Sequence, residues 1–256
     1  MNNSVVLIGF TGLISLILLL AFYLLIKKDL KAGGKRINSF LEKCCNDGAI
    51  LNPKEFHWTK YFRDNQKTIK QEFLNYTKEY IIPAYKDVNE ELSGKTIGWK
   101  SLFLRLFNKD TEIINKFPIA MKLINNCPCT TAYFSKLEPY TKIPKHKGNY
   151  KGVIRYHLSI IIPKQWQNCF IIVDGHKLHW RDDNIDKFDL VFDDIYLHEV
   201  QNNTDQERVI LFLDIKRDFN NFFINVLNTL FLKLIENNEM VINTINKANQ
   251  LNNIKL

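Results

Sequence analysis

Two histidines, His146 and His198, lie far apart in the sequence, each where a predicted strand meets a loop. In a β-roll, strands distant in sequence pair as antiparallel neighbours, so their loop ends can converge at one mouth. Two imidazoles there would bind a divalent first-row metal and leave coordination positions open, as two histidines and a carboxylate do in non-haem Fe(II) oxygenases. Spacing alone leaves open the alternative that each is an ordinary structural histidine.

Two arginines lie in strand-like apolar sequence, where a charge is rarely buried without a partner. Arg155 interrupts the run VIRYHL, and Arg208 directly precedes the run VILFL. Arg155 and His157 are two positions apart and so face the same side of a strand. A guanidinium turned into a barrel suits a dicarboxylate ligand because it can pair with a carboxylate through two hydrogen bonds. The alternative is a structural ion pair with Asp193 or Asp194.

The elements that would position these residues are short segments rich in β-branched and aromatic residues, beginning near residue 130. Turn residues separate them, and Asp174-Gly175 predicts a tight hairpin. The expected strands are 132–137, 153–162, 170–173, 190–192 and 209–215. Many short strands at this spacing predict an all-β barrel or sandwich, since they leave no room for crossover helices.

Helices are expected on both sides of the strands. Residues 67–80 place apolar side chains on one helical face, and so does the tail over residues 218–256. The tail would pack on the β domain, or alternatively lie in a membrane interface.

The N-terminal sequence from Val5 to Ile26 is apolar and carries no charge. A bilayer core requires about 20 such residues, so this segment predicts a single membrane-spanning anchor rather than a cleaved signal peptide. Basic residues follow it and none precedes it, which predicts that the remaining chain is cytosolic, with the endoplasmic reticulum lumen as the alternative. Lys31 to Arg36, with Gly33-Gly34, indicates a short flexible linker.

The composition excludes several classes of protein. With 46% hydrophobic and 24% charged residues among 256, the chain is neither disordered nor a disulfide scaffold. Its 35 basic and 27 acidic residues give a net charge of +8, but no basic stripe interleaved with aromatics is present, so no nucleic-acid partner is expected. Five cysteines, an odd number, suit a reducing compartment.

Several of these motifs together resemble the aspartyl/asparaginyl β-hydroxylase family, which includes lipid A hydroxylases. The resemblance is strong over about 130–217 and weaker from about 55. The motifs that carry it are Tyr133-Phe134-Ser135, His146-Lys147-Gly148-Asn149, Arg155-Tyr156-His157-Leu158, Phe192-Asp193-Asp194, His198-Glu199-Val200 and Arg208. The resemblance implies a mainly β fold with flanking helices, a double-stranded β-helix of jelly-roll or cupin-like type.

Combined with the N-terminal segment, this predicts four regions. They are a transmembrane anchor over 1–28, a linker and helical lead-in over 29–95, the catalytic β-helix over 96–217 and an amphipathic helical tail over 218–256. The sequence makes no prediction of oligomeric state.

The resemblance also implies roles for individual residues. His146 and His198 match the two iron ligands, and Arg155 and His157 match the pair that holds the C1 end of 2-oxoglutarate. Ser135 and Arg208 match the partners of its distal carboxylate, and Trp99 matches a tryptophan that contacts this cosubstrate. Gly148 stands where the ordinary carboxylate ligand would be, and Asp194 is expected to accept a hydrogen bond from a water in its place.

The expected activity is that of a membrane-anchored dioxygenase that uses Fe(II), 2-oxoglutarate and O₂ to hydroxylate an unactivated carbon. The substrate expected first is the β-carbon of peptidyl Asp or Asn. One alternative is a lipid acyl chain. The other is a non-catalytic β-roll that binds an acidic ligand with the same arginines.

Overall fold

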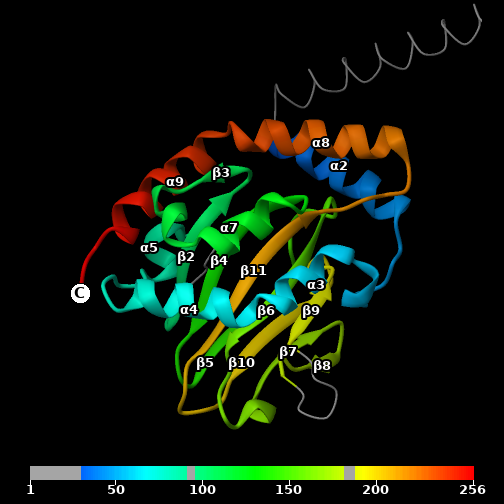
Figure 1. The fold of residues 1–256 in the computed structure, drawn as a ribbon. Coiled ribbons are helices and arrows are strands. Elements are labelled where there is room, and N and C mark those ends of the chain that lie inside the picture. Colours follow the sequence, from blue (N-terminus) through cyan, green and yellow to red (C-terminus); the bar gives the residue numbers. More distant parts are fainter. Residues whose placement is uncertain (1–29, 91–95, 182–187) are drawn as a thin grey trace, which may run out of the picture.

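The computed structural model describes residues 30–90, 96–181 and 188–256 of the chain. Two antiparallel β-sheets form its centre, and helices cover one sheet and cross the strand ends (Figure 1). The strands are β1 (Ile50–Leu51), β2 (Trp99–Leu106), β3 (Lys109–Asp110), β4 (Cys129–Leu137), β5 (Thr141–His146), β6 (Val153–Ile161), β7 (Cys169–Val173), β8 (His176–Leu178), β9 (Asp189–Phe192), β10 (His198–Asn202) and β11 (Arg208–Lys216). The expected mainly β, cupin-like fold with flanking helices is confirmed.

The sheets have the orders β1-β9-β6-β11-β4-β2-β3 and β5-β10-β7-β8. Strands distant in sequence are neighbours, as β11 lies between β4 and β6, and β10 lies between β5 and β7. The hairpin expected at Asp174-Gly175 is confirmed: Val173 pairs with His176 across it, and both turn residues have positive φ, of 48° and 81°. Positive φ at both positions is the conformation of a type I′ turn.

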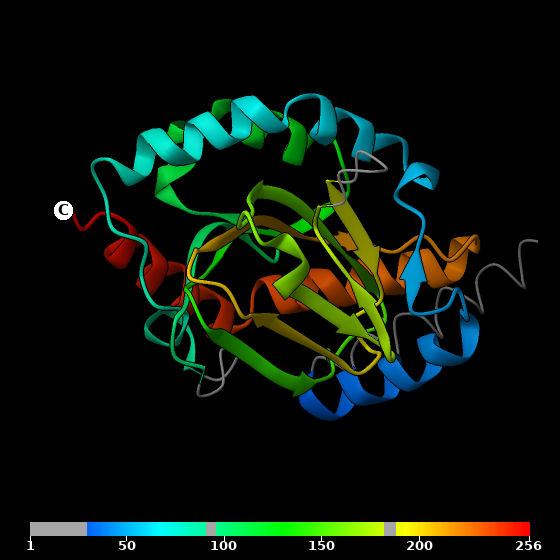
Figure 2. The same ribbon diagram turned by 90° about the horizontal axis from the view of Figure 1, so that it is seen from below.

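The helices are α2 (Leu30–Cys44), α3 (His57–Asp64), α4 (Gln66–Thr77), α5 (Tyr85–Val88), α7 (Pro118–Asn125), α8 (Phe222–Glu236) and α9 (Glu239–Asn252), with 3₁₀ turns η1 (Pro53–Glu55), η2 (Glu112–Lys116) and η3 (Trp166–Asn168). Viewed from below, α4 lies along one side of the sheets, whereas α8 and α9 pass behind the strands and cross their ends (Figure 2). The expected helix over 67–80 is confirmed as α4, and its buried face consists of Ile69, Phe73 and Tyr76.

Strand alternation divides the core into two parts. On β6 and β11, residues such as Tyr156 and Leu211 pack outward against α3, α4 and α7. Residues of opposite parity, such as Phe212, turn inward and pack between the sheets with Ile171 and Val200. Because successive side chains on a strand point to opposite faces, the inner face also receives Arg155, His157 and Arg208.

The linker expected over Lys31–Arg36 is wrong, because these residues belong to α2. Their two glycines do not loosen the chain. Gly33 is buried, and a Cβ added to Gly34 would lie 3.1 Å from Cζ of Phe231 on α8. Glycine therefore permits close approach of α2 to α8. The tail forms two helices instead of one, since Asn238 caps a new helix by accepting a hydrogen bond from the Met240 N–H.

The single-pass membrane placement expected from the sequence is corrected. None of the helices in the described part of the chain is long and apolar enough to cross a bilayer. The longest, α2 and α8, have 15 residues each, which corresponds to about 22 Å against a hydrocarbon core of about 30 Å. The predicted spanning segment from Val5 to Ile26 lies outside the described residues. All five cysteines are free thiols.

Candidate active site

Two imidazoles meet at one edge of the four-stranded sheet. His146 ends β5 and His198 begins β10, and the two residues are direct cross-strand partners with ring centroids 4.1 Å apart. Each Nδ1 lies 2.8 Å from a backbone carbonyl oxygen, of Pro144 and Tyr196 respectively. A carbonyl only accepts, so each Nδ1 carries the proton and each Nε2 keeps its lone pair. Burial lowers the pKa of His146 and lowers that of His198 to about 3, which keeps both rings neutral.

This donor set fits a divalent first-row metal ion with open coordination positions. A third protein ligand is absent: among residues 30–90, 96–181 and 188–256, no cluster of three or more His, Cys, Asp or Glu side chains could hold a metal. Gly148 follows His146 by two positions, and a Cβ there would lie 2.0 Å from Oδ2 of Asp194. The Gly148 N–H also donates to the Asp194 carbonyl at 2.6 Å. The Asp194 carboxylate therefore fills the space that a side chain at position 148 would need.

Arg155 is held by carboxylates on two different elements. Its Nη2 lies 2.7 Å from Oδ2 of Asp194, its Nε lies 3.1 Å from Oδ1 of Asp214, and its guanidinium covers the Phe212 ring at 4.4 Å. The ion pair with Asp194 that the sequence left open is therefore present. Burial raises the pKa of Asp194 to about 6 although Arg155 opposes the shift. Asp214 was not identified as a site residue from the sequence. A signal was present, because this carboxylate lies within an apolar run and shares a strand face with Arg208.

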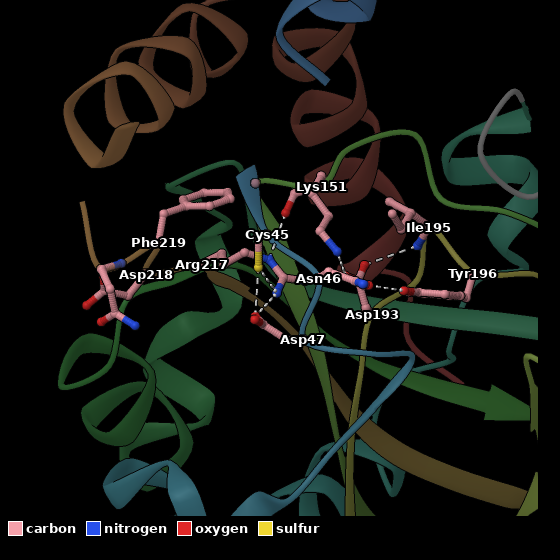
Figure 3. A network of polar contacts seen from close by, with 12 residues as sticks. Cys45, Asn46, Asp47, Lys151, Asp193, Ile195, Tyr196, Arg217, Asp218 and Phe219 are labelled. Carbon is pink, nitrogen blue, oxygen red and sulfur yellow. Dashed lines mark hydrogen bonds and ion pairs between the residues drawn. The ribbon is translucent and has the colours of Figure 1, made fainter. Parts of the chain in front are cut away.

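The neighbouring Asp193 belongs to a separate buried network (Figure 3). Lys151 donates to its Oδ2 at 2.6 Å, and Arg217 pairs with the same oxygen. Arg217 also pairs with Asp47, just after α2, at 2.7 Å. All three central side chains are at most 2% exposed. The network ties the segment after α2 to the loop that carries Asp194 and leads into β10, and so supports the position of His198.

Arg208 differs from Arg155 because it forms no ion pair with a carboxylate of the described residues. It is 1% exposed, and its Nε finds no hydrogen-bond partner among the described residues. Its Nη1 lies 3.5 Å from the Ser135 carbonyl oxygen, and its guanidinium lies over the Trp180 ring at 4.6 Å. His157 is 4% exposed, and its Nε2 also has no partner in the described part of the chain. Two buried donors thus remain unsatisfied on the same inner face.

Ser135 and Trp99 lie on the adjacent strands β4 and β2. The Trp99 Nε1–H donates to Oγ of Ser135 at 3.0 Å, so the hydroxyl is already fixed by one hydrogen bond. Trp180, in the segment after β8, is fully buried and donates from Nε1 to Nδ1 of His157 at 3.2 Å. No sequence pattern distinguished Trp180, because it lies outside the regular strands.

All of the expected site residues except Asp194 line one inner cavity of about 40 Å³: Trp99, Ser135, His146, Arg155, His157, His198 and Arg208. A larger outer cavity of about 420 Å³ adjoins it, and the two share the walls formed by Trp99, Tyr133, Ile143, His146, Arg155 and Phe212. Asp194 lines the outer cavity. The remaining outer wall combines apolar and aromatic residues, among them Tyr85, Phe103, Leu106 and Phe107, with polar or charged ones, among them Thr96, Lys147, Asn149 and Asp214.

Comparison with known proteins gives a consistent family assignment. The family described as Aspartyl/Asparaginyl beta-hydroxylase matches residues 63–218, more than half of the chain. An ornithine lipid ester-linked acyl 2-hydroxylase of Rhizobium tropici is 34% identical over 172 residues, which cover 64% of this chain and 59% of that protein. The match thus spans less than two thirds of the relative's length.

Among solved structures, a Pseudomonas putida prolyl-4-hydroxylase has a TM-score of 0.38 at 14% identity and covers 62% of this chain and 88% of its own. A predicted oxalate decarboxylase from Thermotoga maritima has a TM-score of 0.31 at 12% identity and covers 48% of this chain and 91% of its own. On the sequence match over residues 63–218, the chain belongs to the aspartyl/asparaginyl β-hydroxylase family.

Proposed function

We propose that this protein is an Fe(II)- and 2-oxoglutarate-dependent oxygenase that hydroxylates the acyl chain of a lipid. The observation that supports a dicarboxylate cosubstrate is the guanidinium of Arg208, which is buried and has no counter-ion among the described residues. Burying a charge without a counter-ion is costly, so the site is built for an anion that the protein itself does not supply. The second unsatisfied donor, Nε2 of His157, lines the same cavity.

The residues present fit the iron and its cosubstrate. The Nε2 lone pairs of His146 and His198 would hold Fe(II), which with 2-oxoglutarate and O₂ supplies the oxidising power for conversion of C–H to C–OH. Arg208 and Ser135 would bind the distal carboxylate. His157 would donate to the C1 end, where Arg155 would contribute the part of its guanidinium not held by Asp194 and Asp214.

The outer cavity supports a lipid rather than a peptidyl substrate. Its wall is mostly aromatic and aliphatic, which suits a methylene chain. Arg155, which lines it, is already paired with Asp194 and Asp214, so it presents no net positive charge that would attract a substrate carboxylate. The relative from Rhizobium tropici is named for acyl 2-hydroxylation. Peptidyl Asp or Asn, the substrate expected first from the sequence, is therefore the less well supported candidate.

The test supplies purified protein with Fe(II), 2-oxoglutarate and O₂, and offers extracted polar lipids in one arm and Asp- and Asn-containing peptides in the other. We expect succinate formation and an acyl product 16 Da heavier that carries ¹⁸O from ¹⁸O₂. His198→Ala should abolish both. His179→Ala is the matched control, since His179 packs against Trp166 and Phe170 outside the inner cavity. Hydroxylation of peptides alone would refute the lipid assignment, and succinate formation that survives His198→Ala would refute the iron site.

A further inference from the structure

Trp180 contacts both of the residues that carry the unsatisfied donors, His157 and Arg208. It is fully buried, and its backbone carbonyl accepts a hydrogen bond from Oγ of Ser159 on β6. Ser159 lies two positions after His157 on the same strand face. The backbone at Trp180 is thereby fixed against the strand that carries His157, and the indole ring is held between His157 and Arg208.

The contact with His157 determines which ring nitrogen carries the proton. The indole N–H can only donate, and it points at Nδ1 of His157 from 3.2 Å. Nδ1 must therefore be the acceptor, and the proton of the neutral ring must lie on Nε2. Nε2 is the nitrogen without a partner among the described residues. Trp180 thus turns His157 into a donor toward the cavity.

The contact with Arg208 orients a cation without neutralising it. The guanidinium carbon lies 4.6 Å from the centre of the indole ring, within cation–π range. A carboxylate in that place would satisfy the guanidinium and compete with an incoming anion. The aromatic face instead restrains the guanidinium and leaves its hydrogen bonds available, as the unpaired Nε indicates.

We propose that Trp180 is a positioning residue for the dicarboxylate cosubstrate: its N–H sets the His157 tautomer, and its ring face holds Arg208. One side chain thereby aligns the two donors that would bind 2-oxoglutarate. This inference rests on the proposed function for the identity of the anion. The tautomer that it requires is a property of the protein alone.

The first test is therefore made on the unaltered full chain without metal or cosubstrate. Nuclear magnetic resonance of ¹⁵N-histidine-labelled protein, with the His157 signal assigned by its loss in His157→Gln, reports which ring nitrogen is protonated. We expect the Nε2–H tautomer. Protonation of Nδ1 would overturn the proposal, whatever the activity of the enzyme, because the indole N–H would then have no acceptor on His157.

The second test titrates 2-oxoglutarate into the Mn(II)-loaded protein by calorimetry. Trp180→Phe keeps an aromatic face for Arg208 but removes the N–H, and we expect about tenfold weaker 2-oxoglutarate binding with unchanged Mn(II) affinity. Trp166→Phe makes the same chemical change beside His179, outside the inner cavity, and should leave both affinities unchanged. Unchanged 2-oxoglutarate binding in Trp180→Phe would overturn the positioning role. Absence of binding in the unaltered protein would instead refute the proposed function.

Discussion

Replacement of Arg208 by methionine should separate stability from function. Burial lowers the pKa of Arg208 to about 10 from its ordinary 12.5. At 1.36 kcal/mol per pKa unit, the folded protein disfavours the charged side chain by about 3 kcal/mol relative to the unfolded chain. Both states are protonated below about pH 10, so this penalty is present in full at neutral pH. Methionine removes the penalty and retains most of the apolar volume.

The variant also loses the cation–π contact between Arg208 and the Trp180 ring, and such a contact contributes about 1–2 kcal/mol when buried. This loss partly offsets the stability gained by removing the buried charge. We therefore expect Arg208→Met to raise the free energy of unfolding of the protein without cosubstrate by about 1–2 kcal/mol. Cosubstrate binding should change in the opposite direction. Loss of charged hydrogen bonds to a carboxylate costs about 3 kcal/mol, or roughly a hundredfold in affinity.

Urea denaturation of both proteins, with and without 2-oxoglutarate and Mn(II), measures the two effects together. A ligand that binds only the folded state stabilises it according to its affinity, so 2-oxoglutarate should stabilise the unaltered protein and not Arg208→Met. Lys78→Met, an exposed change on the outside of the molecule, controls for loss of one positive charge. Destabilisation of Arg208→Met by more than about 2 kcal/mol, with cosubstrate binding retained, would refute the reasoning, since it would mean that Arg208 is a satisfied structural cation.

Three further changes test the surrounding geometry by denaturation. Arg155→Met should destabilise the protein by about 3–5 kcal/mol, unlike the same change at position 208, because it leaves Asp194 and Asp214 buried without their cation; a cost below about 1 kcal/mol would contradict this. The pKa of Asp194 is raised to about 6 in the folded protein, so between about pH 4 and 6 the folded state keeps a proton that the unfolded state has lost. The contribution of Asp194 to stability therefore falls as the pH rises through this range. Asp194→Asn should flatten that part of the stability–pH profile in metal-free protein. Gly148→Ala should destabilise the protein because the new Cβ collides with the Asp194 carboxylate. In combination with Asp194→Ala the same change should cost much less, with a coupling energy of about 1–3 kcal/mol between the two sites. Additive effects of the two changes would contradict this contact.

The features that the sequence predicted correctly depend on local patterns, such as the alternation of side chains along one strand. A period of two placed Arg155 and His157 on one strand face, and the structure turns both toward the space between the sheets. The turn at Asp174-Gly175 was equally local, because its backbone conformation depends on those two residues.

The features that were missed depend on long-range register or on packing between elements. Asp214 pairs with Arg155 because β11 aligns beside β6 with these two residues opposite one another, which no pattern within either strand specifies. Gly33-Gly34 was interpreted as a linker from composition, yet it is the close approach of Phe231, some two hundred residues away, that favours a glycine at position 34. Glycine has the same sequence signature in a flexible segment and in a tight helix contact.

One strand produces the electrostatic asymmetry on which the proposed chemistry depends. β11 carries Asp214 near its end and Arg208 at its start, both on the inner face. Its register sets Asp214 opposite Arg155, whereas Arg208 lies opposite Leu137 and pairs with no carboxylate in the described ranges. The positive charge of Arg155, toward the outer cavity, is therefore neutralised by carboxylates, whereas that of Arg208, in the inner cavity, is not neutralised within the described part of the chain. In the proposed reaction the anionic cosubstrate would bind at the inner end, beside the paired imidazoles, and the outer cavity would hold a substrate that carries little charge.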